Sequence, residues 1–528
     1  MGASDFKIPV MSCAQAKSWE KRFFNPANED GTRIPPRERD FMLRAGNGIG
    51  DFILSRFDYE VPSHLLVLVG KGHNGGDALI AARKILKAFP QNTIPAKLVF
   101  FAENWDALAP LTMDAYEDFL RDCGSAPTCF VTRDTGSFPE DFLPEHRGGI
   151  IIDGIYGHGF RPPLQENILR ALTTVNARAN GNLCVAVDLP SGLSDSPVPY
   201  YAFSADFTCA TGIVKTPLLL PANEKYVGRV VPIPVGFPVE SEACCAADTA
   251  SVLNAIPQKR PVFCDKRDFG HALIVGGSRN MPGALMLNTL ACLRAGAGLV
   301  SVLCPGSVHA AFAARAPGAM WIPCKEAPDG SLDLRDTLEK FRKYVSRADS
   351  VLCGSGMGNT PDARAIVQAI AAETPEKSAL ILDADALRPE TLTALRRRGE
   401  NLLLPHAGEF LRLGGDLSAP KALLKKHPIA ALALKGAYTQ VLSAETGTYC
   451  FAGTSALARG GSGDVLAGIT AALFAERKQR PQVSATELLT QAVCWHGNAA
   501  RLWEEAEGPR CADIASLPAY LAAALRQD

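Results

Sequence analysis

The chain has 528 residues, more than one hydrophobic core usually covers, so we expect at least two domains. Hydrophobic residues make up 47% of it and charged residues 21%, which is ordinary for a globular protein. Lys and Arg number 54 and Asp and Glu 55, so the net charge is -1. No basic excess points to nucleic acid or to an anionic membrane, and we expect neither as a partner.

The first residues, MGASDFKIPVMSC, lack the order of a secretion signal, and no apolar run approaches the roughly 18 residues of a membrane span. We therefore expect a cytoplasmic protein. The 15 cysteines are odd in number and contain no CxxC pair, which favours reduced core thiols over disulfides or a zinc site. Cys244 and Cys245 are adjacent but have no nearby His or second pair, so metal binding is not expected there.

Short runs rich in Val, Ile and Leu alternate with helical segments, a pattern typical of parallel sheets covered by helices, and the pattern occurs twice. In the first half we expect helices at 11–24 and 37–57, and strands at 65–69, 96–101, 149–153 and 183–188. Polar or glycine loops follow: GKGHNGGD from Gly70 to Asp77, IYGHGF after Asp153, and LPSG after Asp188. Because parallel strands end at one edge of a sheet, these loops should converge.

Between 239 and 259 no strand is evident, so we place a linker at 241–259, between domains at 1–240 and 260–528. The second domain should have helices at 283–296 and 488–503, and strands at 271–275, 299–303, 350–353, 379–382, 401–404 and 430–434. Polar loops again follow the strands. Gly354, His406, Lys435 and Asp464 should therefore share one rim.

The segment GTSALARGGSGDVLAGIT, from Gly453 to Thr470, is the candidate centre of chemistry. Glycines before an apolar helix let backbone N–H groups converge, so Gly460 to Gly463 should hold an anion such as phosphate. Asp464 on its own is also explained as an acid that complements the helix dipole. The Walker A pattern is absent, which disfavours a P-loop ATPase.

In the first half, Gly70, Gly72 and Gly75 satisfy GxGxxG after a strand. The acid that a dinucleotide-binding fold carries about twenty residues later is missing, which disfavours a simple NAD-dependent dehydrogenase. Turn residues after the strands also offer hard oxygen ligands for a cation; these are Asn74, Asp153 and Ser191.

Two residues of the second half have open alternatives. Lys435 is either a solvated lysine or a group that neutralises nucleotide phosphates. His406 is either a hydrogen-bonded structural histidine or a site residue.

Taken in order, these motifs resemble known families. GKGHNGGD, IDGIYGHG and VDLPSG are similar to the motifs of NAD(P)H-hydrate epimerases, and Phe41 to Gly46 is similar to their upstream helix. IVGGS, GSGMG, DADAL, PHAGE, KGAYT and GGSGDVLAG are similar to the ADP-dependent NAD(P)H-hydrate dehydratase, a ribokinase-like enzyme. The order is that of fused repair enzymes, which implies a Rossmann-like three-layer α/β/α domain followed by a ribokinase-like α/β domain.

The resemblance also implies site residues. In the first domain the hydrated cofactor would contact His73, Asn74, Gly75, Gly76, Asp77, Gly157, His158, Gly159, Phe160, Arg161, Pro162, Pro163 and Asp188, and K⁺ would bind Asn74, Asp153 and Ser191. In the second, Ala284, Gly356, His406 and Asp464 would face the hydrated nicotinamide, and Lys435, Gly436, Ala437, Tyr438, Thr439 and Gly463 the nucleotide. The chain departs from the family at His73, where Asn is usual, and at Ala78, where Gly is usual. The His73 departure bears on substrate contact and on pH response in the epimerase.

The implied substrates are NADHX and NADPHX, which have gained water across the C5–C6 double bond. Hydroxide leaves poorly, so ADP or ATP, with Mg²⁺, would phosphorylate the C6 hydroxyl before elimination. Asp464 would accept the hydroxyl proton, and the Gly460 to Gly463 amides would stabilise the transferring phosphoryl group. Asp188 would act as acid or base in interconverting the R and S forms at C6.

The alternative is a ribokinase-type kinase for a vitamin or sugar alcohol, with a non-catalytic N-terminal scaffold domain. Such a kinase would accumulate a phosphorylated product, whereas the dehydratase would release phosphate. We expect a homo-oligomer. The sequence leaves open the choice between ADP and ATP and between NADHX and NADPHX.

Overall fold

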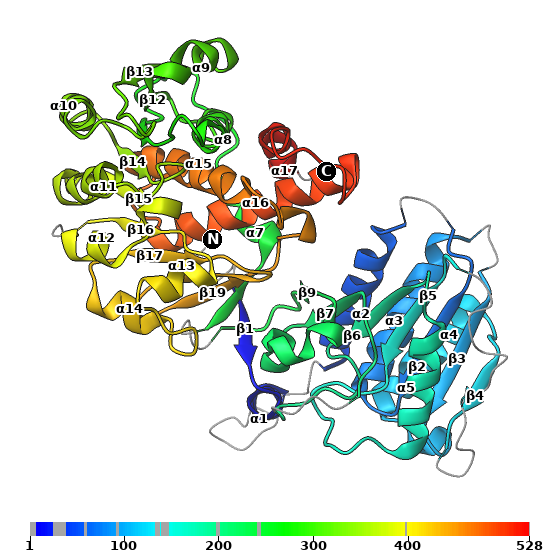
Figure 1. Cartoon of the computed structure of the whole chain (residues 1–528). Coiled ribbons are helices and arrows are strands. Elements are labelled where there is room, and N and C mark those ends of the chain that lie inside the picture. The colour runs from blue at the N-terminus through cyan, green and yellow to red at the C-terminus, as the bar shows by residue number, and fades with distance from the viewer. Residues whose placement is uncertain are drawn as a thin grey trace. The chain divides into compact units, whose positions relative to one another are not determined.

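The computed structural model describes residues 7–24, 38–57, 61–90, 94–132, 138, 147–196, 201–239, 244–395 and 399–526. The chain forms two compact units that divide between Glu240 and Ser241 (Figure 1). Within the described ranges, no helix combines the length and the apolar character needed to span a membrane.

The N-terminal unit contains a sheet in the order β4-β3-β2-β5-β6-β7-β9, in which each neighbouring pair is parallel. The strands are β2 Leu65–Gly70, β3 Ala96–Phe101, β4 Thr128–Phe130, β5 Ile150–Gly154, β6 Leu183–Val187, β7 Phe207–Thr211 and β9 Arg229–Ile233. The order reverses between β2 and β5. Such a reversal leaves a crevice at the carboxyl ends of the strands, where ligands bind.

Helices cover both faces of this sheet. They are α1 Cys13–Phe24, α2 Glu38–Leu54, α3 His73–Ala88, α4 Pro110–Cys123, α5 Glu166–Arg178 and the short α6 Glu224–Val227. Along β2, Val67 and Val69 pack in the core under α2, α3 and α4, whereas Leu66 and Leu68 pack in the core under α5. This alternation follows from the two-residue period of a strand. A separate short strand, β1 (Lys7–Met11), pairs with β8 (Val214–Lys215).

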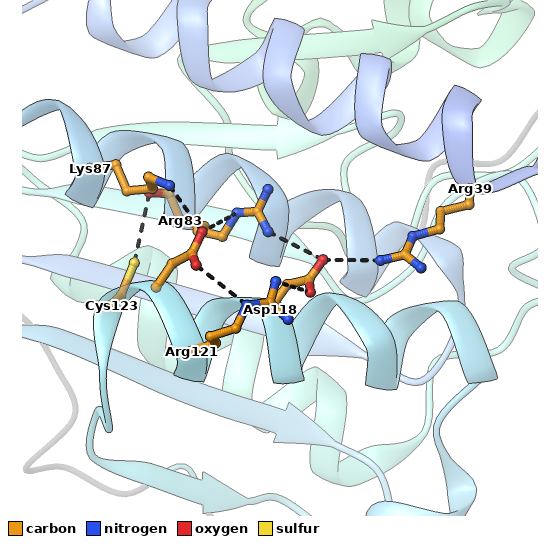
Figure 2. Close-up of polar contacts among 7 residues, drawn as sticks. Arg39, Arg83, Lys87, Asp118, Arg121 and Cys123 are labelled. Carbon is orange, nitrogen blue, oxygen red and sulfur yellow. Dashed lines mark hydrogen bonds and ion pairs between the residues drawn. The ribbon is translucent and has the colours of Figure 1, made fainter.

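A polar network joins α2, α3 and α4 on the outside of that layer (Figure 2). The Asp118 carboxylate on α4 accepts a hydrogen bond from Arg121 and lies 3.3 Å from both Arg39 and Arg83. Burial would raise the pKa of Asp118, but the three guanidinium groups outweigh it and hold the pKa below its usual range. The network therefore connects the helices that carry part of the cavity wall described below.

The C-terminal unit contains a larger sheet, which runs from β13 through β12, β11, β14, β15, β16, β17, β18 and β19 to β10. It is parallel from β13 to β17, antiparallel across β18 and β19, and parallel again between β19 and β10. The strands are β10 Cys245–Ala247, β11 His271–Val275, β12 Leu299–Pro305, β13 Met320–Cys324, β14 Ser350–Cys353, β15 Ala379–Leu382, β16 Asn401–Leu403, β17 Ala431–Leu434, β18 Thr439–Leu442 and β19 Gly447–Cys450.

Two hydrophobic cores flank this sheet, one on each face. The helices are α7 Thr249–Asn254, α8 Pro282–Arg294, α9 His309–Arg315, α10 Leu334–Val345, α11 Pro361–Glu373, α12 Pro389–Ala394, α13 Ala407–Arg412, α14 Lys421–Lys426, α15 Ser462–Ala475, α16 Ala485–Glu507 and α17 Leu521–Leu525. α15 is buried along its whole length from Val465 to Ala475. A Cβ on Gly468 would lie 2.3 Å from the Asn288 carbonyl oxygen, so this glycine lets α15 pack closely on α8.

The strands and helices expected from the sequence are present, with two corrections. The segment from Gly70 to Asp77 was expected as a loop, but α3 already begins at His73. The expected linker at 241–259 contains β10, which pairs with β19, and α7. β10 was missed because three small residues are too few to show the alternation of apolar and polar side chains that marks a strand. The domain limits proposed from the sequence otherwise stay a prediction.

Candidate active sites

A cavity of about 390 Å³ lies at the carboxyl ends of β2, β5 and β6 in the N-terminal unit. One wall is aromatic, with the rings of Phe41 and Phe237 stacked 5.0 Å apart between centroids. The predicted site residues that line it are His73, Asn74, Asp77, Gly157, His158, Gly159, Phe160 and Asp188. They converge beside the reversal of strand order, as the sequence predicts.

Other residues predicted for this site lie away from the cavity. Gly75 and Gly76 are buried in the first turn of α3, where a Cβ on Gly75 would lie 2.1 Å from the Gly70 carbonyl oxygen. Gly75 therefore allows α3 to approach β2 closely. Arg161, Pro162 and Pro163 do not line the cavity, and their contact with a substrate stays a prediction.

Asp188 is the most constrained residue of this cavity. It is a non-glycine residue in the left-handed region, with φ 66°, and is only 3% exposed. Its Oδ1 accepts hydrogen bonds from the Lys215 ammonium and from Thr211 Oγ1 (3.0 Å), and its Oδ2 accepts one from the His158 backbone N–H (3.3 Å). Burial alone would raise the pKa of Asp188, but Lys215 and His158 outweigh it and hold the pKa well below its usual range. Asp188 is therefore a carboxylate.

His158 lies between two carboxylates. Its Nδ1 is 3.6 Å from Asp188 Oδ2, and its Nε2 is 3.2 Å from Glu20 Oε2 on α1. Burial would lower the pKa of His158, but hydrogen bonds and charge from Asp188 and Glu20 raise it to about 9. The ring is therefore a cation at neutral pH, and it faces the cavity.

Of the three residues predicted to hold K⁺, Asp153 and Ser191 are hydrogen-bonded to each other, and Asn74 lines the cavity. Asp153 is fully buried and accepts hydrogen bonds from the Ser191 hydroxyl (2.7 Å), the Ser191 N–H (2.8 Å) and the Ile155 N–H (3.2 Å). Burial raises the pKa of Asp153 to about 6, and hydrogen bonds from Ser191 and Ile155 oppose the shift. Asn74 donates to the Val187 carbonyl (3.0 Å), and its Oδ1 lies 3.0 Å from where a Cβ on Gly157 would be.

Asp77, in the first turn of α3, is a buried acid that lines the cavity. Its Oδ1 has no hydrogen-bond partner among the described residues. Burial, with the charge of Asp188, raises the pKa of Asp77 well above its usual range. The departures from the family pattern fall on either side of it: His73 is exposed at the cavity, whereas Ala78 is buried in the core. Of these two departures, only His73 lines the cavity, and its contact with a substrate stays a prediction.

The second candidate site is the N-terminus of α15. Gly461 precedes the helix in the left-handed region, with φ 94°, which turns the chain into the helix. A Cβ on Gly463 would lie 3.2 Å from Lys435 Nζ, so the ammonium group faces the first turn of the helix. Free N–H groups, the helix dipole and an ammonium therefore meet at one point, which favours an anion there.

Asp464 follows in the same turn and is partly buried. Burial raises its pKa to about 6, and the negative charges of Asp383 and Asp385 add to this effect, while Ser355 and Lys435 oppose it. Because the pKa lies just below neutral pH, the carboxylate is available as a base at pH 7.

Lys435 is held by carboxylates from neighbouring strand ends. Its Nζ lies 2.7 Å from Asp383 Oδ1, after β15, and 4.0 Å from Glu409 Oε2, after β16. Burial would lower the pKa of Lys435, but these acids raise it, so the lysine is charged. It is therefore not a solvated surface lysine.

The other predicted residues of this unit separate into two groups. A Cβ on Gly356 would lie 3.3 Å from the Ala284 Cβ, and the adjacent Ser355 hydroxyl faces Asp464, so Ala284 and Gly356 lie together near this acid. In the turn between β17 and β18, Gly436 and Ala437 are exposed, and Tyr438 and Thr439 are half-buried. Contact of this turn with a nucleotide stays a prediction.

His406 has a structural role that the sequence left open. It is the N-cap of α13, where its Nδ1 accepts hydrogen bonds from the Gly408 N–H (3.0 Å) and the Glu409 N–H (3.3 Å). The side chain is 60% exposed. The cap does not use Nε2, which lies 3.5 Å from Glu409 Oε1, so a role for this nitrogen in substrate contact stays a prediction.

The structure adds residues that sequence reasoning did not assign to the sites. Lys215 is a single lysine in an apolar run, and it is 1% exposed, a combination that signals a buried ion pair.

His496, on α16, is buried beside Lys435 and Ser462, and its Nε2 has no hydrogen-bond partner within the described ranges. Burial and Lys435 lower the pKa of His496 to about 4, so it is neutral. The remaining additions are Glu20, Thr211, Asp383 and Glu409.

Comparison with known proteins finds a family match for each unit. Residues 38–217 match the family model described as YjeF-related protein N-terminus, and residues 272–521 match the model described as NAD(P)H-hydrate dehydratase. The bifunctional NAD(P)H-hydrate repair enzyme of Thermosynechococcus vestitus is 31% identical, covering 93% of this chain and 92% of that protein. The enzyme of the same description from Gloeobacter violaceus is 34% identical, covering 82% and 83%.

Solved structures match the C-terminal half. A ribokinase-like superfamily protein from Enterococcus faecalis is 25% identical with a TM-score of 0.46, covering 55% of this chain and 99% of that one. The ADP/ATP-dependent NAD(P)H-hydrate dehydratase from Bacillus subtilis, co-crystallised with ATP and Mg²⁺, is 24% identical with a TM-score of 0.42, covering 52% and 95%. On the family models and the identity over nearly the full length of its relatives, the chain belongs to the bifunctional NAD(P)H-hydrate repair enzymes, with a Rossmann-like epimerase domain followed by a dehydratase domain.

Proposed function

We propose that the two units act in sequence on hydrated NADH and NADPH. The N-terminal cavity interconverts the R and S forms of NADHX and NADPHX, and the α15 site dehydrates the S form at the expense of a nucleotide. The observation that carries the dehydratase half is the position of Asp464, a partly buried acid with a pKa of about 6 in the first turn of a helix that also faces the Lys435 ammonium.

The dehydration is proposed to begin with phosphoryl transfer to the C6 hydroxyl. Asp464 accepts the hydroxyl proton, while the N–H groups at Gly460 to Gly463 and the Lys435 ammonium stabilise the charge on the phosphoryl group. The phosphate then leaves with the C6–O electron pair as the ring nitrogen donates its lone pair, and loss of a C5 proton restores the double bond. Phosphate is a far better leaving group than hydroxide.

ADP is the proposed donor, with ATP as the competing choice. Mg²⁺ would enter with the nucleotide, because the described residues contain no group of three or more His, Cys, Asp or Glu side chains that could hold a metal ion alone. The carboxylates near Asp464 nevertheless suit a bound Mg²⁺. Asp383 and Asp385 raise the pKa of Asp464 by their charge, so the rim carries an excess of negative oxygen atoms that a bound cation would relieve.

K⁺ is the proposed resident cation of the N-terminal unit, with Asn74, Asp153 and Ser191 as ligands. The support is chemical: Asp153 is fully buried, and among the described residues no Lys, Arg or His pairs with it. A monovalent cation would offset that buried charge. When bound, K⁺ would supply positive charge behind the loops that carry Gly157 and Asp188.

Thermal unfolding tests the cation. The midpoint temperature for unfolding of the N-terminal unit should be higher in KCl than in choline chloride at the same ionic strength. Asp153→Asn should remove this difference. An equal midpoint in both salts for the unchanged chain would exclude resident K⁺.

Turnover of synthetic NADHX of mixed R and S forms tests the function. The full chain should restore near-ultraviolet absorbance completely with ADP and Mg²⁺, and free phosphate should appear in equal amount. A phosphorylated product that persists would favour the kinase alternative. Recovery of only the S fraction, at the spontaneous rate for the remainder, would show that the N-terminal unit is not an epimerase.

A further inference from the structure

We propose that His158 is the proton-transferring residue of the epimerase cavity, and that Asp188 and Glu20 position it. The proposal rests on the proposed epimerase function and assigns its chemistry to a different side chain from the one that the sequence favoured. It follows from how the hydrogen-bonding capacity of each residue is used.

Asp188 has little capacity left for a substrate. Its Oδ1 accepts from Lys215 and Thr211, and its Oδ2 accepts from the His158 N–H and lies 3.6 Å from His158 Nδ1. The side chain is 4% exposed. A carboxylate that is buried, accepts hydrogen bonds at both oxygens and is paired with an ammonium is a weak base, and the pKa of Asp188 lies well below its usual range.

His158 has the opposite properties. Its side chain is 22% exposed and lines the cavity directly. The imidazole is held at both nitrogens, by Asp188 at Nδ1 and by Glu20 at Nε2, so its orientation is set before a substrate enters. Glu20 is 24% exposed and lies on the cavity wall, so a substrate hydroxyl can replace it at Nε2.

Other ionisable groups face this ring from the surrounding elements. Glu38 comes from α2, Lys71 from the turn between β2 and α3, and His73 and Asp77 from the first turn of α3. Lys215, on β8, is paired with Asp188. Two carboxylates, Asp188 and Glu20, contact the His158 ring directly. These two contacts favour the positively charged form of the ring.

The chemistry follows from the substrate, whose C6 carries both a hydroxyl and the ring nitrogen. The His158 imidazolium gives its proton to the hydroxyl, the C6–O bond breaks, and water leaves with the electron pair. The nitrogen lone pair forms a C6–N double bond, so the ring carries the positive charge. Water then adds to C6 from either face and returns a proton to His158. No oxidant or reductant is required, and atoms and charge balance.

The test compares epimerisation of R-NADHX by the full chain and by His158→Gln and His158→Ala. Both variants should slow R-to-S conversion at least about a hundredfold, the usual scale for a general acid or base, while dehydration of S-NADHX in the other unit is unchanged. Added imidazole should restore a measurable part of the rate in His158→Ala. His64→Gln, at the amino end of β2 and away from the cavity, is the matched control and should retain the original rate.

Each outcome decides a different point. Full activity in His158→Gln, or a loss in His158→Ala that imidazole does not restore, would overturn the assignment to His158. If the unchanged chain fails to accelerate R-to-S conversion at all, the proposed epimerase function fails, and this proposal with it.

Discussion

Lys435 and the buried Asp383 form an ion pair, with Nζ 2.7 Å from Oδ1, directly beside the first turn of α15. The two residues come from the ends of different strands, β17 and β15. Asp383 holds the Lys435 ammonium at the positive end of the helix dipole. The Asp464 carboxylate lies beside this ammonium. An incoming phosphate therefore meets positive groups, while a hydroxyl beside it meets a base.

Replacing Gly463 tests this arrangement, because a Cβ there would lie 3.2 Å from Lys435 Nζ and 3.8 Å from Asp383 Oδ2. Gly463→Val should displace the ammonium and lower kcat/KM for dehydration at least about tenfold, which is about 1.4 kcal/mol. Steady-state kinetics with S-NADHX and ADP measures it. Gly318→Ala, where a Cβ would meet only ordinary contacts at 3.6 Å, is the control. An unchanged kcat/KM in Gly463→Val would show that Lys435 acts elsewhere.

Asp464→Asn keeps the shape of the side chain and removes the base. We expect the variant to fold and to lose dehydration by at least about a hundredfold, with R-to-S conversion retained. The control is Asp362→Asn, which removes an acid from the first turn of another helix, α11. It alters the charge at that helix N-terminus in the same way but should leave the dehydration rate unchanged. Near-original turnover in Asp464→Asn would mean that this acid is only a helix-terminal charge.

The pH dependence of dehydration follows from the Asp464 pKa of about 6. The base is active when ionised, so kcat/KM should rise with pH up to about 6 and then level off. Asp383→Asn removes the negative charge that raises the Asp464 pKa, so the midpoint of the rise should move to lower pH. A pH–rate profile for both proteins checks the direction. A midpoint that moves upward would contradict the assigned coupling.

The sequence was most informative where strands are buried on both faces. β2, with LLVLVG, and β5, with IIIDG, are continuous apolar runs, which is the pattern of central parallel strands. β13, with MWIPC, has an exposed edge and a mixed pattern, and it was missed. The start of α3 was assigned to a loop because HNGG favours a turn, whereas close packing of Gly75 on Gly70 decides for helix. That contact is tertiary and has no local signal.

The sites show the same division. Motif order predicted that Gly354, His406, Lys435 and Asp464 share a rim, and the structure places Lys435 beside the first turn of α15, which contains Asp464. Motif order did not reveal that Asp188 is held by Lys215, because Lys215 lies on β8 and belongs to none of the motifs. Which member of a hydrogen-bonded cluster is free to act depends on distances that only the fold supplies.

Lys215→Met tests the buried pair with Asp188. Removing one partner leaves an uncompensated buried carboxylate, which typically costs about 3–5 kcal/mol of the free energy of unfolding. Urea unfolding of the full chain should show a transition of the N-terminal unit at lower denaturant, with the C-terminal transition unmoved. Adding Asp188→Asn should recover part of the loss, since the charge is then absent. Lys225→Met, at an exposed position on α6, is the control. Equal stability of Lys215→Met and the unchanged chain would contradict the pairing.

The pH dependence of epimerisation separates His158 from Asp188 as the proton donor. The raised pKa of His158, about 9, comes from Asp188 and Glu20, so the imidazolium is present below this pH and is lost above it. kcat/KM for R-to-S conversion should therefore be level near neutral pH and fall as pH rises through about 9. Glu20→Gln keeps a hydrogen-bond acceptor at Nε2 but removes its charge, so the fall should begin at lower pH. If the pH–rate profile is the same in Glu20→Gln, or if kcat/KM rises as pH rises through about 9, His158 is not the proton donor.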